Sequence, residues 1–159
     1  MQATPDADPA RVYHNIAVAI DATRQLFNGQ PATIGAWIDA LDLTHGARVL
    51  HVGYGLGYYT GVMAHCVGPA GRIVAYEVDD TLAAEARQNL ASMPWVEVRH
   101  GDAAAALEDS FDAILVNAGV THPLETWLDR LAPGGRMILP LTSTCPRWAR
   151  RSEKDSCSS

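Results

Sequence analysis

The stretch VLHVGYGLG, residues 49–57, decides the fold of this chain. A short apolar run leads directly into three glycines at alternate positions, Gly53, Gly55 and Gly57. Such a loop brings bare backbone against a ligand, because glycine tolerates positive φ and has no Cβ to collide with it. Residues 58–67 are then expected to form a helix whose first amides face a polar ligand. A glycine-rich turn that binds nothing is the alternative.

Apolar runs and helical patterns alternate from residue 48 onward. Strands are expected at 48–52, 72–77, 95–99, 111–116 and 136–141, and helices at 58–67, 80–91, 103–107 and 123–131. Strands joined through helices form right-handed crossovers in a parallel sheet with helices on both faces. The sequence therefore predicts an α/β fold with a doubly wound, mainly parallel, Rossmann-like sheet.

The segment before the first strand is predicted to be helical. Spaced apolar residues predict a helix over 11–27 and a second over 32–43, separated by the turn residues 28–31. Residues 11–46 would then be N-terminal helices and 47–142 a cofactor-binding core, together one domain over 11–142. Residues 1–10 are predicted to be a flexible leader. The serine-rich residues 143–159 are predicted to be a disordered tail, with a basic tail that binds a partner as the alternative.

Composition narrows the class of protein. The chain has 159 residues, 48% of them hydrophobic, which is enough for one domain with a core. A formal net charge of −6 argues against binding to nucleic acid or a membrane surface. No apolar run is long enough to span a membrane, and the first residues lack the order of a signal peptide. Three cysteines without a C-x-x-C spacing predict neither a zinc site nor disulfides, so no metal and a cytoplasmic location are expected.

Polar residues follow each strand where a ligand would bind. In an open α/β sheet, ligands bind beyond the carboxyl ends of the strands. Glu77 ends the second strand, Asp102 follows the third and Asn117 follows the fourth. A carboxylate at Glu77 suits the two hydroxyls of a ribose, and one at Asp102 suits the amino group of an adenine. The alternatives are an exposed acid at the strand end for Glu77 and a turn or helix cap for Asp102.

Residues 48–142 resemble a class I S-adenosylmethionine-dependent methyltransferase, and most closely the protein-L-isoaspartate O-methyltransferase family. The resemblance covers more than half of the chain. The Gly-Tyr-x-Thr continuation at 57–60 and the Pro-Gly-Gly-Arg-x-x-x-Pro ending at 133–140 are fairly specific to the family. The matching segments are RVLHVGYGLGYYTGVMA (48–64), VGPAGRIVAYEVDDTLAAEARQNL (67–90), VEVRHGDA (96–103), FDAILVNAG (111–119) and LAPGGRMILPL (131–141).

The resemblance implies S-adenosyl-L-methionine as cofactor and methyl transfer to a carboxylate, with an isoaspartyl residue in a protein or another carboxylate as the favoured acceptor. A small-molecule acceptor or a different protein acceptor is the alternative. The residues expected at the cofactor are His51, Gly53, Tyr54, Gly55, Gly57, Tyr58, Glu77, Val78, Gly101, Asp102, Ala103 and Asn117. The catalytic residues are unknown; Asn117 and His122 are weak candidates, and a His122 without a chemical role is the alternative for that residue.

The chain departs from the family pattern beside the cofactor. The family usually has an acid two residues before the first glycine, where it helps to hold the methionine ammonium, and here that residue is His51. A neutral imidazole accepts a hydrogen bond, whereas a protonated one repels the ammonium and the sulfonium. Weak cofactor affinity that falls in mild acid is therefore expected. The alternative is a His51 packed away from the cofactor.

Other departures concern catalysis and the end of the sheet. The family serine before the second helix falls on Gly29, so its hydroxyl is missing, and Asn28 and Thr33 are the candidate substitutes for it. After 136–141 the family sheet has two more strands, which this sequence lacks. The strand 136–141 would then be an open edge, able to pair with another chain in a homo-oligomer. A truncated or degenerate module that binds adenosylmethionine without turnover is the alternative to an enzyme. The glycine spacing disfavours an NAD-dependent oxidoreductase.

Overall fold

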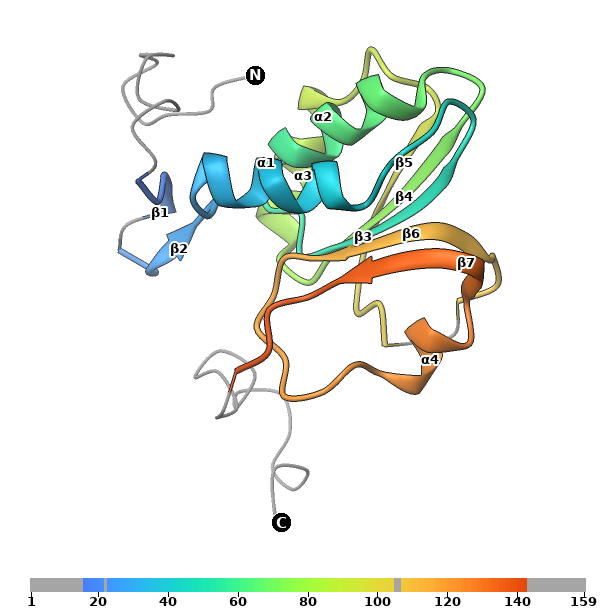
Figure 1. Ribbon diagram of the computed structural model, residues 1–159. Helices are drawn as coiled ribbons and strands as arrows, with labels where there is room; N and C mark the ends of the chain where they lie inside the picture. Colours follow the sequence, from blue (N-terminus) through green and yellow to red (C-terminus); the bar gives the residue numbers. More distant parts are fainter. Residues whose placement is uncertain (1–15, 22, 105–106, 143–159) are drawn as a thin grey trace.

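A five-stranded parallel sheet forms the centre of the molecule (Figure 1). The computed structural model describes residues 16–142 except 22, 105 and 106, so the expected leader at 1–10 and tail at 143–159 lie outside the described residues. The strand order is β5-β4-β3-β6-β7, and all four pairings are parallel. The strands are β3 (Arg48–Val52), β4 (Arg72–Glu77), β5 (Val96–His100), β6 (Phe111–Val116) and β7 (Leu131–Ile138).

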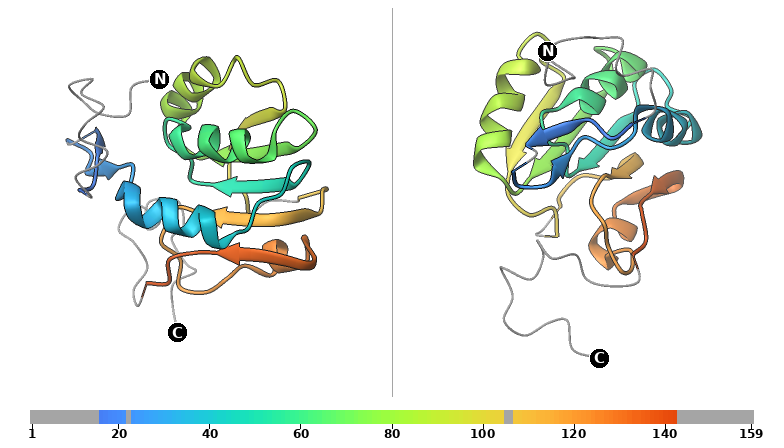
Figure 2. Two further views of the ribbon diagram at one scale, coloured as in Figure 1. Left: turned by 45° about the horizontal axis from the view of Figure 1, so that its top comes forward. Right: turned by 90° about the vertical axis from the view of Figure 1, so that its left-hand side faces the viewer.

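Helices cover both faces of the sheet, as expected for a doubly wound fold (Figure 2). They are α1 (Pro31–Ala40), α2 (Tyr58–Val67), α3 (Asp80–Asn89) and α4 (Glu125–Leu128). Ile38 of α1 and Met63 of α2 pack with Val49 on one face. Trp127 of α4 packs with Leu50 on the other. Because side chains alternate along a strand, neighbouring residues 49 and 50 supply two separate cores.

Much of the predicted order is confirmed by these elements. The bounds of β3, α2, β4 and β6 match the predicted ranges, and α3 and β5 begin within one residue of theirs. Asp79 caps α3, since its Oδ1 accepts a hydrogen bond from the Leu82 amide at 3.0 Å. Capping and turn residues therefore determine where these helices and strands begin and end.

The predicted helix over 11–27 is wrong in its described part. Residues 19–27 contain a hairpin of β1 (Ala19–Asp21) and β2 (Leu26–Phe27) instead. Ile16, Val18 and Ile20 recur at every second position, a strand period that the helical interpretation overlooked. The Asp21 carboxylate closes the turn by accepting from the Thr23 amide at 2.9 Å. Among the described residues, a hairpin followed by one helix, rather than two helices, therefore precedes the sheet.

The predictions after β6 need correction as well. The helix expected over 123–131 is only α4, and the strand expected at 136–141 is β7, which begins five residues earlier. Phe111 pairs with Leu131 but Ala113 pairs with Arg136, so the Pro-Gly-Gly stretch at 133–135 forms an irregularity inside the strand.

Two further predicted helices differ from the structure. The helix expected over 32–43 ends at Ala40, and Asp42 follows with a positive φ of 53°. The helix expected over 103–107 is not seen at its described residues, and 105–106 lie outside them. Within the described residues β7 lies at one edge of the sheet, so association through that edge stays a prediction. No helix in this part of the chain is long and apolar enough to cross a membrane.

Substitution of Leu50 tests how much the core between the sheet and α4 contributes to stability. Its side chain is fully buried, whereas Leu128 of α4 is 47% exposed. Leu50→Ala is expected to lower the free energy of unfolding by about 2–5 kcal/mol, through lost burial and a residual cavity. Leu128→Ala, the matched control, should cost less than about 1 kcal/mol. Urea unfolding followed by circular dichroism measures both, and equal losses in the two variants would contradict this packing.

Candidate functional site

The carboxyl ends of four strands bring most of the predicted residues together. Val52 of β3 pairs with Tyr76 on one side and with Val116 on the other, and Glu77 pairs with His100. The residues that follow these partners therefore lie along one edge of the sheet. They are the glycine loop after β3, residues 77–78 at the end of β4, residues 101–103 after β5 and Asn117 after β6.

The glycine loop, residues 53–57, is tightly packed by the rest of the chain. Gly53, Gly55 and Gly57 have positive φ angles of 74°, 57° and 84°. A Cβ on Gly55 would lie 2.8 Å from Cδ1 of Ile20, and one on Gly57 would lie 2.8 Å from Cδ1 of Leu90. The fold itself thus requires glycine at these positions, and a ligand is not needed to explain them.

The Glu77 carboxylate holds the loop in place. Its Oε2 accepts a hydrogen bond from the Gly55 amide at 2.9 Å, and its Oε1 accepts from the amides of Val78 and Asp79 at 3.0 and 3.2 Å. The residue is 8% exposed. A carboxylate offers about four lone-pair positions, so three amide bonds leave capacity for a ligand hydroxyl. Glu77 is therefore a structural acid that still presents an acceptor, and not the exposed acid of the alternative interpretation.

The residues beside Glu77 line the same edge in different ways. Val78 is 57% exposed, an apolar surface at the strand end. Asp102 is exposed, and its Oδ1 accepts from the Ala104 amide at 2.8 Å, which is the turn-capping role weighed as its alternative. The other carboxylate oxygen can still accept from a ligand. Ala103 is buried, with its carbonyl accepting from the Trp127 indole at 3.1 Å, and Gly101 donates to the Glu77 carbonyl at 2.8 Å.

The two tyrosines of the loop region point elsewhere. Tyr54 is fully buried among Ala75, Ala83 and Ala86, and this burial raises the pKa of its phenol. Only its backbone is left for a ligand contact. Tyr58 is partly buried and packs edge-to-face on Tyr59, with ring centroids 5.1 Å apart. The sequence did not reveal that the Tyr54 side chain is buried, because the glycine motif alone gives no side-chain direction. A ligand contact by Tyr58 stays a prediction.

His51 is part of the core under α2. It is fully buried, and its Nδ1 is 2.8 Å from Oγ1 of Thr60. Its Nε2 is buried without a hydrogen-bond partner among the described residues. Burial lowers the pKa of His51 to about 3. The imidazole is therefore neutral in mild acid, and the expected acid-sensitive cofactor affinity does not follow from this arrangement.

The two weak catalytic candidates lie in different settings. The backbone amide of Asn117 donates to the Val52 carbonyl at 2.8 Å, and the backbone carbonyl oxygen of Asn117 would be 3.3 Å from a Cβ on Gly53. It therefore lies directly beside the glycine loop. His122 is exposed on the loop before α4, where its Nδ1 is 3.0 Å from Oγ1 of Thr121. No described contact connects His122 with the strand ends, so Asn117 is the better placed of the two.

Sequence reasoning missed the hairpin that covers the loop. Ile20 of β1 contacts Gly55, and Arg24 in the hairpin turn forms an ion pair with Asp79, the cap of α3. Asn28, directly after β2, is 6% exposed, and its Oδ1 is 3.9 Å from the place of a Cβ on Gly55. The alternating apolar residues 16, 18 and 20 were the signal that could have revealed this hairpin.

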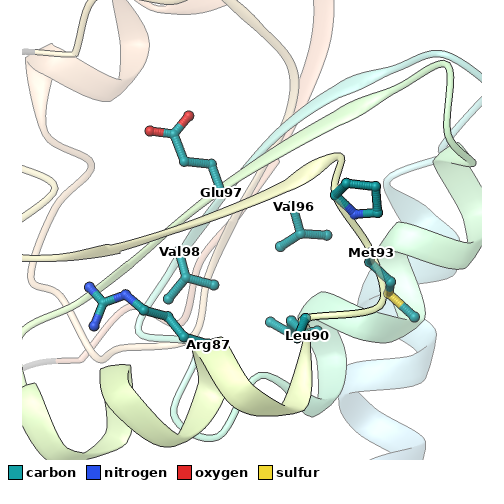
Figure 3. A pocket seen from close by; sticks show the side chains of 8 residues that line it. Arg87, Leu90, Met93, Val96, Glu97 and Val98 are labelled. Carbon is teal, nitrogen blue, oxygen red and sulfur yellow. The ribbon is translucent and has the colours of Figure 1, made fainter.

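A separate hollow of about 330 Å³ lies between α3 and the beginning of β5 (Figure 3). Val96 and Val98 face Leu90 there and Arg87 lies beside Val98, while the Glu97 side chain points to the other side of β5. It lies over the first half of β5 and not beyond the strand ends, so it is distinct from the edge described above. Among the described residues, no group of three or more histidines, cysteines and acids is placed to hold a metal.

Chemically, the residues at the carboxyl edge can recognise a nucleoside-like ligand through hydrogen bonds and apolar contact. The described residues there do not include a group that could hold a metal ion. Glu77 and Asp102 present acceptors for hydroxyl and amino groups, Val78 presents an apolar surface, and the glycine loop presents backbone. The arrangement therefore suits orientation of a reactive ligand more than proton transfer.

Comparison with known proteins gives one consistent result. The family model for protein-L-isoaspartate(D-aspartate) O-methyltransferase matches residues 4–158. A protein-L-isoaspartate O-methyltransferase of Aeropyrum pernix is 37% identical over 116 residues, which are 70% of this chain and 45% of that protein. One of Methanopyrus kandleri is 35% identical over 131 residues, 77% of this chain and 58% of that protein. The chain thus spans about half the length of the curated relatives it matches.

Solved structures agree with the sequence relatives. A protein-L-isoaspartate O-methyltransferase structure superposes with a TM-score of 0.77 at 28% identity, over 88% of this chain and 46% of that one. An S-adenosylmethionine-dependent O-methyltransferase of Thermotoga maritima gives a TM-score of 0.58 at 27% identity, over 68% of this chain and 43% of that one. The resemblance in the glycine loop and strand ends therefore extends through the fold.

The buried His51 predicts a specific dependence of stability on pH. Its pKa falls from 6.5 to about 3 on folding, so between these values the unfolded chain binds one more proton than the folded chain. Stability is therefore full above pH 6.5 and is lost as the pH falls. Between pH 7.5 and 5.5 this group should remove about 1.4 kcal/mol from the free energy of unfolding.

Urea titrations at the two pH values measure this loss. His51→Gln removes the titrating group and should flatten the dependence by that amount. His65→Gln, at an exposed position of α2, is the matched control and should leave it unchanged. A His51→Gln variant that loses as much stability in acid as the native sequence would show that His51 is not buried in its neutral form.

Proposed function

We propose that this chain, which belongs to the protein-L-isoaspartate(D-aspartate) O-methyltransferase family, binds S-adenosyl-L-methionine and methylates a carboxylate of an isoaspartyl residue in a protein or peptide. The names of its relatives support an isoaspartyl residue as the methyl acceptor. The geometry of the glycine loop and the strand ends supports a cofactor site there. The observation that carries the proposal is the Glu77 carboxylate at the end of β4, held by three amides beside the glycine loop.

The residues at the carboxyl edge fit an adenosyl ligand. The remaining acceptor capacity of Glu77 suits the ribose hydroxyls, and the free carboxylate oxygen of Asp102 suits the exocyclic amino group of adenine. The exposed Val78 between them would pack against the base. Backbone of the glycine loop would lie along the rest of the ligand. Among the sequence-predicted contacts, Gly101 and Asn117 complete this edge by position.

Methyl transfer to a carboxylate requires little from the protein beyond orientation of the two reacting groups. When bound, S-adenosyl-L-methionine supplies a methyl group made electrophilic by its sulfonium. An isoaspartyl carboxylate is already an anion at neutral pH, so no side chain has to remove a proton from it. The protein's part is to hold the carboxylate in line with the methyl group and to exclude water. Asn117, beside Gly53, is the residue best placed to orient an acceptor carboxylate through its amide.

A cofactor-binding module without turnover is the second candidate. Gly29 falls where the family has a serine tied to its catalysis, and here no hydroxyl is available. Its φ is +78°, and an added Cβ would lie 3.1 Å from Cγ1 of Ile34. The backbone at this position is thus built around glycine, which favours a chain adapted to bind more than to catalyse.

Glu77→Gln tests the cofactor site. The substitution removes the negative charge that accepts from the ribose, and a hydrogen bond to a charged group contributes about 1.5–3 kcal/mol. The dissociation constant for S-adenosylhomocysteine should rise roughly 10- to 100-fold by calorimetry. Glu85→Gln, at an exposed position of α3, is the control and should bind as the native chain does. Native affinity in the Glu77→Gln variant would place the ribose elsewhere.

A methyl-transfer assay separates the two candidate functions. The chain is incubated with methyl-labelled S-adenosyl-L-methionine and an isoaspartyl peptide, and the aspartyl peptide of the same sequence is the control. Enzyme function predicts label in the isoaspartyl peptide alone, released by mild base as expected for a methyl ester. Binding of the cofactor with no label in either peptide would support the module and overturn the proposed transfer.

A further inference from the structure

Asn28 is a buried polar residue with an unused acceptor. The backbone amide of Asn28 donates to the Val18 carbonyl at 2.7 Å, and the Gly29 carbonyl accepts from the Val18 amide at 3.3 Å. These two hydrogen bonds hold the backbone of residues 28 and 29 against Val18. The side chain is 6% exposed. Its Oδ1 is buried and has no hydrogen-bond partner among the described residues. A buried acceptor without a donor is unfavourable, and native structures retain such groups chiefly for a reason.

The position of Asn28 connects this acceptor with the glycine loop. Its Oδ1 is 3.9 Å from the place of a Cβ on Gly55, and Ile20 of the same hairpin contacts Gly55 as well. The second buried polar atom without a described partner is Nε2 of His51, which belongs to the strand that leads into this loop. Of these two orphaned polar atoms, Oδ1 of Asn28 is the one that lies beside the centre of the loop.

The charged acceptors nearby are already assigned other partners. Glu77 accepts from three amides, and its remaining capacity is assigned to the ribose hydroxyls. Asp79 caps α3 and pairs with Arg24, and Asp21 accepts from the amides of its own turn. His51 is neutral and lies against Thr60. A cationic group above the centre of the loop therefore has Oδ1 of the Asn28 side chain as its free buried acceptor.

The direction of the ligand selects the group that Asn28 meets. The proposed acceptors for ribose and adenine, Glu77 and Asp102, follow β4 and β5, on one side of the loop. The amino-acid half of the ligand must then extend along the loop after β3, where Asn28 lies over Gly55. The cationic group in that half is the α-ammonium, which has three hydrogen-bond donors.

We propose that Oδ1 of Asn28 accepts a hydrogen bond from the α-ammonium of S-adenosyl-L-methionine, in place of the acid that the family usually has at the position of His51. This inference rests on the proposed function. A neutral amide attracts the ammonium less than a carboxylate does. The N-terminal hairpin, and not the end of β3, therefore supplies the acceptor, and the site distinguishes ligands with an amino-acid end from those without one.

Two ligands and three variants test this assignment by calorimetry, which needs no turnover. S-adenosylhomocysteine carries the ammonium, whereas 5′-methylthioadenosine has the same adenosine and sulfur without the amino-acid end. Asn28→Ala should weaken binding of S-adenosylhomocysteine about 5- to 30-fold and leave 5′-methylthioadenosine unchanged. The isosteric Asn28→Asp, which guards against a folding defect in the alanine variant, should bind S-adenosylhomocysteine several-fold more tightly and 5′-methylthioadenosine as before.

Asn89→Ala is the comparison for a purely structural effect. The Asn89 side chain donates to the Leu56 carbonyl at 3.0 Å and so supports the loop from α3 without an orphaned acceptor. This variant should weaken both ligands by the same factor. Asn28 variants that change both ligands equally, or neither, would overturn the assignment while the proposed function stands. Failure of the native chain to bind either ligand would overturn the proposed function, and this inference with it.

Discussion

The hydrogen bond between the Glu77 carboxylate and the Gly55 amide connects two strand ends on which the whole candidate site depends. At 2.9 Å it fixes the centre of the glycine loop to the end of β4, while the amides of Val78 and Asp79, between β4 and α3, hold the same carboxylate. The loop conformation, the position of Val78 and the entry into α3 are therefore coupled. A ligand that uses the remaining acceptor capacity of Glu77 would meet a loop that is already in place, and such preorganisation lowers the cost of binding.

The N-terminal hairpin gives the site its second wall. Ile20 packs on Gly55, Arg24 reaches Asp79 at the cap of α3, and Asn28 brings a buried amide to the loop. The site thus combines one fixed carboxylate with neutral polar groups, since His51 is held uncharged beneath α2. Binding at the amino-acid end then relies on hydrogen-bond direction more than on charge.

The sequence predicted the parallel sheet because its strands are apolar runs bounded by glycine, proline and capping residues. The ranges 48–52, 72–77 and 111–116 matched for this reason, and the register then brought Glu77 and Asp102 to one edge. The helix over 11–27 failed because short alternating runs carry both periods, and tertiary contact with the loop selects the strand. His51 and Tyr54 show a different limit: the motif places the backbone, but the packing of α2 and α3 decides where these side chains point.

One ligand is proposed to bind along the glycine loop and the ends of β4 and β5. Amide chemical shifts of the ¹⁵N-labelled chain, followed during titration with S-adenosylhomocysteine, locate its binding site. The largest changes are predicted at Gly53, Gly55 and Gly57, with further changes at Val78 and Asp102. Changes centred instead on the hollow between α3 and β5, with the glycine amides unmoved, would contradict the account.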